Sequence, residues 1–195
     1  MKTMTNRVSN IKIETLSEQW AKLEKVTFDY QLKDGRWVEQ TRESYNRGDG
    51  AVILLYNKEN RTVILTKQFR MPTMLNGNDS GFVIEACAGM LDKDDPENCI
   101  IREVEEETGY RIPKVEKVFE LFSTPGAVTE KLYYFIGEYK PSMKVGSGGG
   151  LDSENEDIEV LELSFEKVTD MLYTGEIKDA KTVLLLLYLQ NKKLL

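Results

Sequence analysis

A single helix, bounded by strong start and stop signals, is the feature that most constrains this 195-residue chain. Asp95 is a good N-cap, Pro96 suits the first helical position, and Gly109 ends the helix at its C-terminus. Ile100 and Val104 are four residues apart, so one stripe of the helix can face a core. The sequence therefore predicts a half-buried helix with one polar face.

Three carboxylates share that polar face, because Glu103, Glu106 and Glu107 are spaced i, i+3, i+4. Glu103 and Glu107 repel each other by roughly 0.2–0.5 kcal/mol, and all three lie near the negative end of the helix dipole. Sequences break local rules mostly at functional sites, and a hard divalent cation would remove this repulsion. The pattern indicates a metal-binding face, although a bare acidic run of this kind is more often a solvated helix end.

The surrounding residues favour the metal-binding interpretation. The run R-E-V-E-E-E-T-G-Y from Arg102 to Tyr110 follows a loop that begins at Gly89, and it resembles the Nudix box of the Nudix hydrolases. The box is one residue shorter than usual between Gly89 and Arg102, and Asp95 stands where the family usually has Glu. Neither departure touches the three glutamates, and the shortened box looks like that of one branch, the GDP-mannose pyrophosphatases.

The resemblance to this branch extends over most of the chain. It covers Y-N-R-G-D-G-A-V-I-L-L-Y-N, K-Q-F-R, N-G-N-D-S-G, I-E-A-C-A-G, S-T-P-G-A-V-T-E, G-G-G-L-D and T-G-E-I-K-D-A-K-T-V-L-L-L. It implies hydrolysis of the diphosphate of a nucleotide sugar, with GDP-mannose giving GMP and mannose 1-phosphate, and Mg²⁺ as cofactor with Mn²⁺ as the alternative cation. An ADP-ribose or ADP-sugar pyrophosphatase stays open. So does a nucleotide sensor without activity, although a sensor would not need three clustered carboxylates.

The resemblance also implies site residues. The metal ligands would be the backbone carbonyl of Ala88 and the side chains of Glu103, Glu106, Glu107 and Glu156, with Glu106 binding directly or through water. Arg102 would pair with an acid and hold the box together. The substrate contacts would be Trp20, Arg42, Glu43, Arg70, Ala88, Gly89, Met90, Glu130 and Lys181, whereas Thr41 replaces a family Lys.

Two of these substrate contacts have a structural alternative. Arg70 suits a phosphate because a guanidinium binds it bidentately, but it could equally be a surface arginine. Trp20 offers a flat face to a base or sugar, although a lone Trp in a small sheet is more often part of a core.

The chain contains no histidine, so acid–base chemistry falls to other groups. We expect the general base to be a carboxylate on the segment 140–157, with Glu156 favoured over Glu154 and Glu130 as the next candidate. The glycine run 146–150 before it suggests the hinge of a mobile lid, with plain disorder as the alternative. Catalysis would then rest on Glu156 together with Glu103 and Glu107.

Alternation of apolar and polar residues predicts strands and helices in a mixed order, which indicates an α/β or α+β fold. The strands are expected at 8–15, 23–32, 37–45, 51–56, 62–69, 82–88, 117–122, 132–139 and 158–165, and further helices at 165–173 and 180–192. The resemblance specifies a Nudix α/β/α sandwich at 48–195, preceded by an antiparallel β subdomain at 1–47. The first three strands are too small to bury much alone, so we expect them to pack across a homodimer.

The composition of the chain argues against some classes of binding partner. A net charge of −7 argues against nucleic acid, because no basic surplus can displace counterions. No segment is apolar enough for a membrane span, and residues 1–10 lack the apolar core of a signal peptide. Cys87 and Cys99 are expected to be buried thiols, which fits a cytoplasmic location. Two cysteines without histidine cannot form a standard zinc site.

Overall fold

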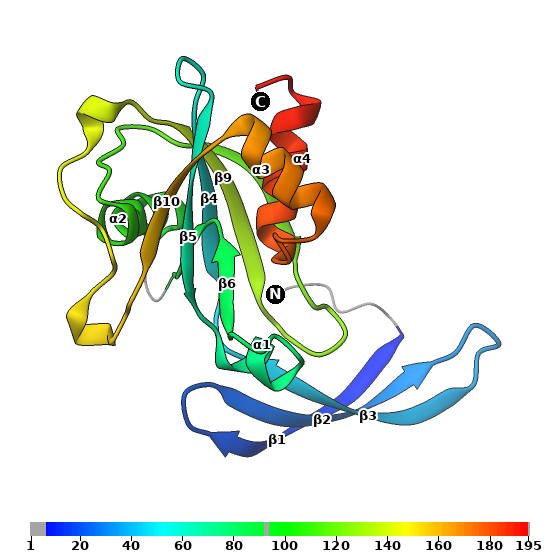
Figure 1. Cartoon of the computed structure of the whole chain (residues 1–195). Coiled ribbons are helices and arrows are strands. Elements are labelled where there is room, and N and C mark those ends of the chain that lie inside the picture. The colour runs from blue at the N-terminus through cyan, green and yellow to red at the C-terminus, as the bar shows by residue number, and fades with distance from the viewer. Residues whose placement is uncertain (1–6, 92–93, 195) are drawn as a thin grey trace. The chain divides into compact units, whose positions relative to one another are not determined.

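The computed structural model describes residues 7–91 and 94–194, which form two compact units (Figure 1). The first unit runs to Asp49 and also contains the returning segment Phe122–Lys131. The second contains Gly50–Leu121 and Leu132–Leu195. The sequence predicted the boundary at residue 47 and placed the returning segment in the second domain, as part of 48–195. Residues 1–6 of the expected subdomain, which include most of the segment examined for a signal peptide, lie outside the described ranges.

The first unit is a three-stranded antiparallel sheet in the order β1-β2-β3. Its strands are β1 (Val8–Glu18), β2 (Lys22–Gln31) and β3 (Trp37–Asn46). The expected turn between β2 and β3 is present, and Gly35 supplies its left-handed residue at φ 89°. The returning segment adds to β3, because Tyr45 donates to the carbonyl of Ala127 and accepts from the N–H of Thr129.

The second unit is built around a seven-stranded mixed sheet in which β10-β5-β4-β9-β8 form the main path. Its strands are β4 (Gly50–Asn57), β5 (Thr62–Phe69), β6 (Phe82–Glu85), β7 (Cys87–Met90), β8 (Glu116–Phe122), β9 (Lys131–Glu138) and β10 (Glu159–Ser164). Its helices are α1 (Met71–Leu75), α2 (Pro96–Thr108), α3 (Phe165–Thr174) and α4 (Ala180–Asn191), with 3₁₀ turns at Pro141–Met143 and Asp152–Glu154. The predicted elements are confirmed within a few residues, except the strand at 82–88, and α1 and both 3₁₀ turns were not foreseen.

Every residue of β4 is buried, which explains its unbroken apolar sequence. Successive side chains of a strand point to opposite faces, and each face of β4 joins a different core. Leu54 belongs to the cluster that contains Leu185 of α4, whereas Ile53 belongs to the cluster that contains Ile100 and Val104 of α2. Helix α2 therefore covers one face of the sheet and α3 with α4 cover the other (Figure 1). This arrangement confirms the predicted α/β/α sandwich.

The single strand predicted at residues 82–88 is wrong, because the chain changes its partner at Ala86. Strands β4 and β5 pair only at Leu55–Asn57, so they diverge at the other end. There β6 pairs with β5 and β7 pairs with β4. The N–H of Ala86 at the crossing donates to Thr182 Oγ1 at 2.7 Å. This crossing places Glu85 in one network and Ala88 in another, as described below.

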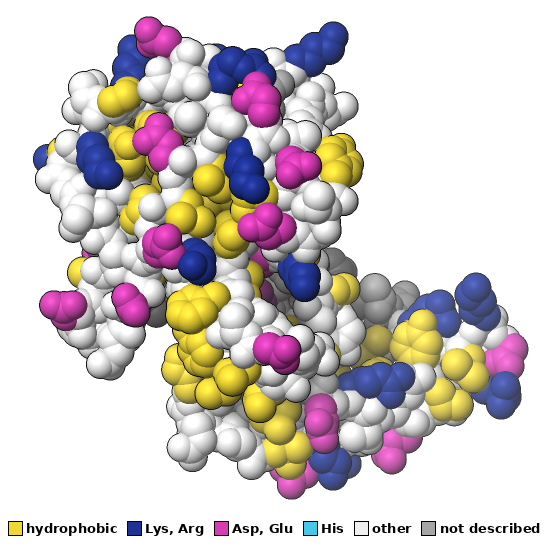
Figure 2. All heavy atoms as spheres, in the orientation of Figure 1, with side chains coloured by type: hydrophobic (Ala, Val, Ile, Leu, Met, Phe, Trp, Pro, Cys, Tyr) yellow, Lys and Arg dark blue, Asp and Glu magenta, His cyan; other side chains and the backbone are white. Residues whose placement is uncertain are grey.

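The surface carries charges of both signs. Figure 2 shows Lys and Arg side chains interspersed with Asp and Glu over the face of the larger unit. Exposed pairs such as Arg61 with Glu166 contribute little to stability because water screens them. Among the described residues, none of the helices is long and apolar enough to cross a membrane.

Candidate active site

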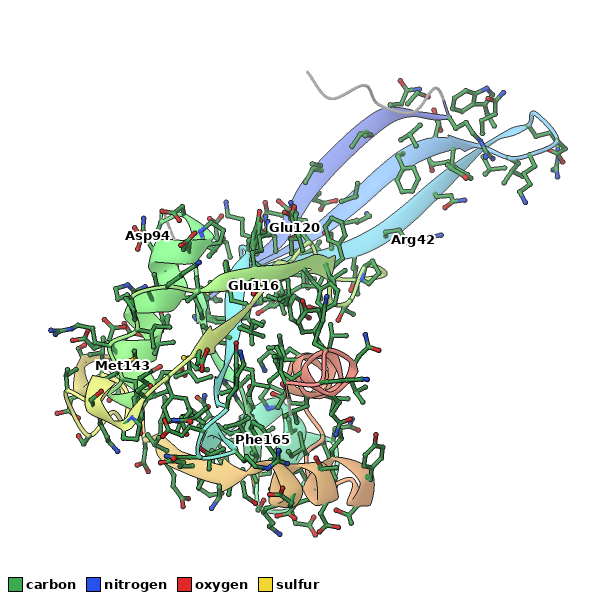
Figure 3. The ribbon with its side chains drawn as sticks, turned by 90° about the horizontal axis from the view of Figure 1, so that it is seen from above. Arg42, Asp94, Glu116, Glu120, Met143 and Phe165 are labelled. Atoms are coloured by element: carbon green, nitrogen blue, oxygen red, sulfur yellow. The ribbon has the colours of Figure 1, made fainter. Side chains whose placement is uncertain are left out.

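The acidic helix α2 begins and ends as the sequence predicted. The side chain of Asp95 accepts hydrogen bonds from the N–H groups of Glu97 and Asn98, at 3.1 and 3.2 Å. Pro96 is the first helical residue, and Gly109 is left-handed at φ 74°. Figure 3 shows the helix with Asp94 at its start and Met143 beside its far end. These caps fix the length of the helix and hence the positions of its carboxylates.

Glu107 is the most deeply buried acid of this helix, with 2% of its surface exposed. Its carboxylate accepts hydrogen bonds from the Cys87 thiol and the Ala88 N–H. Its second oxygen, Oε2, is buried and has no hydrogen-bond partner within the described part of the chain. A buried carboxylate oxygen without a partner is costly, so this atom marks a place where a ligand would stabilise the protein.

Glu103 lies against β7. A Cβ atom added to Gly89 would overlap the Glu103 carboxyl group, so only glycine allows this approach. The backbone of Ala88 and Gly89 therefore passes directly beside the acidic face, as the resemblance implied for a metal-ligating carbonyl. The structure brings Ala88, Gly89, Glu103 and Glu107 together within one unit.

Burial raises the pKa values of Glu103 and Glu107 more than nearby hydrogen bonds and positive charges lower them. Burial is the main reason that the pKa of Glu107 rises to about 8, and the charges of Glu103 and Glu156 raise it further. Burial likewise raises the pKa of Glu103 to about 7, although the nearby Arg102 guanidinium acts in the opposite direction. Both values differ from the ordinary 4.5 in the direction that an added cation would reverse.

Arg102 forms the acid pairs expected of it. Its guanidinium lies 2.9 Å from Glu103 Oε1 and 2.7 Å from Glu106 Oε2, one helical turn away. The carboxylate of Glu106 is therefore held by Arg102, on the same helix face as Glu103.

These residues fit a divalent cation by their chemistry. The donor set consists of carboxylate oxygens and a backbone carbonyl, which suit Mg²⁺ and Mn²⁺. Glu107 Oε2 is a buried acceptor without a hydrogen-bond partner among the described residues. Within residues 7–91 and 94–194, however, no three Cys, Asp or Glu side chains are already gathered into a metal cluster. Joint ligation by Glu103, Glu106, Glu107 and Glu156 thus stays a prediction.

The loop that carries Glu156 is attached to α2, which differs from the free hinge expected at 146–150. The N–H groups of Gly149 and Gly150 donate to backbone carbonyls in the last turn of the helix. Glu156 is half-buried and accepts a hydrogen bond from the Leu151 N–H at 3.0 Å, whereas Glu154 is exposed. Of the two acids considered for the base, Glu156 is the one whose charge reaches Glu103 and Glu107.

Arg70 and Lys181 converge on a buried acid that the sequence analysis missed. Glu85 Oε1 lies 2.8 Å from Arg70 Nε, and Glu85 Oε2 accepts from Lys181 Nζ. Lys181 also pairs with Asp179 at 2.7 Å. Arg70, Glu85 and Asp179 line a cleft of about 540 Å³ beside α1.

The two cations determine the ionisation of this acid. Burial alone would raise the pKa of Glu85, but the charges of Lys181 and Arg70 outweigh it and lower the pKa. The sequence could have indicated this network, because Glu85 stands in the apolar run F-V-I-E-A-C-A and buried acids are almost always paired.

The remaining candidates lie in the first unit. The Arg47 guanidinium stacks 5.2 Å from the Trp20 ring centre and lies 3.1 Å from Glu130. Trp20 is 68% exposed, so its alternative role as a core residue is wrong. Arg42 and Glu43 are exposed on β3, and Figure 3 shows Arg42 projecting from that strand. Arg47, which joins Trp20 to Glu130, was not predicted.

The fold and the acidic helix define the class of protein. Residues 46–186 match the family model of the NUDIX domain, and the chain belongs to this family of hydrolases. Residues 7–45 match a second model, the GDP-mannose pyrophosphatase NudK N-terminal domain.

The chain is similar over almost its whole length to proteins of one branch of this family, the GDP-mannose pyrophosphatases. The chain is 51% identical over 192 residues to a GDP-mannose pyrophosphatase from Escherichia coli strain SMS-3-5, covering 98% of this chain and 100% of that protein. It is 50% identical, with the same coverage, to the GDP-mannose pyrophosphatase of E. coli strain K12. Among solved structures, an ADP compounds hydrolase shares the fold, with a TM-score of 0.70 at 16% identity and full coverage of both chains.

Proposed function

We propose that this chain hydrolyses the diphosphate of GDP-mannose to GMP and mannose 1-phosphate, with Mg²⁺ as cofactor and Mn²⁺ as a substitute. The observation that carries the proposal is the buried Glu107, with its raised pKa, next to the half-buried Glu103 beside the β7 backbone. The 51% identity to a GDP-mannose pyrophosphatase over almost the whole chain supports the substrate. A nucleotide sensor would gain nothing from burying Glu107 Oε2 without a partner.

The side chains have separate tasks in this reaction. Glu103 and Glu107, with the Ala88 carbonyl, would hold the cation, and Glu106 would join them on leaving Arg102. When bound, the cation neutralises phosphate oxygens and makes water easier to deprotonate. Glu156 would accept the proton from the attacking water, because the chain offers no histidine and Glu156 is the half-buried acid of its loop.

Each unit carries proposed substrate contacts. Arg70 presents its guanidinium to the cleft beside α1 while Glu85 holds it, which suits a phosphate oxygen. Lys181, Gly89 and Met90 would contact the substrate in the same unit. From the first unit we assign Trp20 to stack on a planar group, and Arg42, Glu43 and Glu130 to hydrogen bond with it.

We also propose a cytoplasmic homodimer. Strand β1 exposes Ile11, Ile13 and Leu16, at 43%, 63% and 45%, on a sheet of three strands. A second copy that covered these side chains would remove apolar surface from water. Cys87 and Cys99 are both buried and are not joined in a disulfide, which fits a reducing compartment. Light scattering that showed a monomer at micromolar concentration would contradict the dimer.

The decisive assay compares GDP-mannose with ADP-ribose at equal concentrations in Mg²⁺, and quantifies GMP and mannose 1-phosphate. We expect a higher kcat/KM for GDP-mannose and no turnover in EDTA. Glu103→Gln should lower turnover by orders of magnitude with an unchanged melting temperature. A higher kcat/KM for ADP-ribose would assign the ADP-sugar activity instead, and activity that survives EDTA would refute the cation requirement.

A further inference from the structure

Three consecutive glycines before the Glu156 loop adopt left-handed backbone angles. Their φ values are 68° at Gly148, 113° at Gly149 and 84° at Gly150. A residue with a Cβ atom rarely adopts such angles, and three in a row require glycine. The run therefore has one defined shape, which the chain could not adopt with other residues.

This shape brings two N–H groups to the end of helix α2. Gly149 donates to the carbonyl of Glu107 at 2.9 Å, and Gly150 donates to the carbonyl of Glu106 at 3.1 Å. The last carbonyls of a helix have no partner within the helix itself. The run thus provides partners for the backbone of two residues whose side chains belong to the acidic face.

Close packing leaves no room for a side chain at two of these positions. A Cβ atom at Gly148 would overlap the carbonyl oxygen of Glu107 and lie 2.6 Å from the carbonyl carbon of Thr108. A Cβ atom at Gly150 would overlap the carboxylate of Glu156 and lie 2.5 Å from its Cβ. One glycine therefore touches the helix and the other touches the loop acid.

The loop acid is fixed from its other side as well. Leu151, which follows the run directly, donates its N–H to Glu156 Oε2 at 3.0 Å. The side chain of Glu156 therefore lies back against the glycine run, and its charge raises the pKa of both Glu103 and Glu107. The N–H groups of Gly149 and Gly150 thus bind α2, and the N–H of Leu151, the next residue, binds the Glu156 carboxylate.

We propose that Gly148–Gly150 form a clamp that fastens the Glu156 loop to the C-terminal turn of α2, so that Gly148 and Gly150 are positioning residues for the reaction. The clamp holds the loop acid and the acidic helix as one body, whereas a hinge would let the loop open and close. The catalytic part of this inference rests on the proposed function of Glu156. The structural part concerns the protein without substrate.

Hydrogen–deuterium exchange on the wild-type, metal-free protein tests the structural part. The clamp predicts slow exchange at the amides of Gly149 and Gly150, comparable to the last turn of α2. Exchange at the rate of an unstructured peptide would overturn it. This measurement uses neither substrate nor variants, so it stands even if wild-type protein fails to cleave GDP-mannose, a result that would refute the proposed function alone.

Variants test the catalytic part against a matched control. Gly148→Ala and Gly150→Ala should each lower kcat roughly 10²-fold with KM changed less than about threefold, as expected when a reacting group is misplaced by about 1 Å. Gly146→Ala should match wild type, because a Cβ there meets no atom within 4 Å and φ is not positive.

Titration calorimetry with Mn²⁺ alone supplies a readout besides activity. We expect weaker Mn²⁺ binding by Gly148→Ala than by Gly146→Ala, because Gly148 touches the Glu107 backbone. Folded Gly148→Ala and Gly150→Ala proteins with wild-type kcat and Mn²⁺ affinity would overturn the proposal. If either variant does not fold, the exchange measurement on wild type decides.

Discussion

Glu85 and Glu107 are nearly equally buried in the same unit, at 3% and 2% exposure, but their surroundings differ. Arg70 and Lys181 contact Glu85 directly and lower its pKa. Within the described residues, Glu107 accepts hydrogen bonds from a thiol and a backbone N–H, and its pKa is raised to about 8. Two cations already stabilise the charge of Glu85, whereas a bound cation would stabilise the charged form of Glu107.

The comparison separates structural from functional acids. Glu85 orients two cations, so its loss should affect folding and the geometry of Arg70 and Lys181. Glu107 carries a charge that is costly in the absence of a cation, so its loss should affect activity and spare the fold. Each expectation can be measured.

The largest effect is expected for Glu107→Gln. Turnover of GDP-mannose should fall on the order of 10³-fold, comparable to the loss of one group that stabilises transition-state charge. The free energy of unfolding in EDTA at pH 7 should not decrease, because the folded carboxyl, with its pKa of about 8, must take up a proton at pH 7 and a neutral amide does not. Kinetics and chemical denaturation on the same preparation check both statements. Wild-type turnover would show that Glu107 is merely a core residue.

The second effect concerns pH in the metal-free protein. The carboxyls of Glu103 and Glu107 have pKa values of about 7 and 8 when folded and near 4.5 when unfolded. Between pH 5 and 8 the unfolded chain releases protons that the folded protein retains, so the free energy of unfolding should fall by several kcal/mol as pH rises. Urea denaturation in EDTA measures this slope.

Two controls sharpen the pH prediction. Excess Mg²⁺ should reduce the loss at pH 8, because a cation that binds only the folded protein stabilises it. Glu107→Gln should flatten the slope, because it removes the group with the larger shift. Stability that rises from pH 5 to 8 in EDTA would contradict the electrostatic description of this site.

The third effect is expected for Glu85→Gln, which should destabilise the fold by about 2–3 kcal/mol. The variant removes the carboxylate that pairs with both Arg70 and Lys181, although Asp179 still pairs with Lys181, whose side chain is 17% exposed. Activity should also fall, because Arg70 loses the partner that orients it. Thermal melting and kcat/KM check these outcomes, and a melting temperature equal to wild type would show that Glu85 is dispensable.

The smallest effect is expected for Glu166→Gln, a matched change at an exposed ion pair. Arg61 Nη2 lies 2.8 Å from Glu166 Oε1, but the two side chains are 57% and 67% exposed. We expect a change of at most about 0.5 kcal/mol in the free energy of unfolding, since water screens such pairs. A loss as large as that of Glu85→Gln would mean that burial does not explain the comparison.

Sequence reasoning succeeded where local rules decide the structure. The caps Asp95 and Gly109 and the spacing of the three glutamates determine the helix and its acidic face. The unbroken apolar run of β4 indicated a strand covered on both sides. These features depend on neighbours within a few positions, so a single sequence contains them.

It failed where distant segments meet. The break at Ala86 depends on the divergence of β4 and β5, which no local pattern records. The pairing of Glu85 with Lys181 joins residues 96 positions apart. The glycine run was interpreted as a hinge because glycine permits motion, whereas its angles serve contact with the carbonyls of α2. Periodicity cannot distinguish these two uses of glycine.

The parallel pairing of β4 with β9 has a consequence for how the chain folds. Gly50 pairs with Leu132, so the central strands of the sheet can pair only after a further 82 residues have been made (132 − 50). Helix α2 is synthesised before β9, whose Phe135 completes the core beneath it. Contacts this distant in sequence form slowly. On the ribosome, the apolar strand β4 should therefore emerge long before β9 can pair with it, which makes β4 a segment expected to need protection by a chaperone.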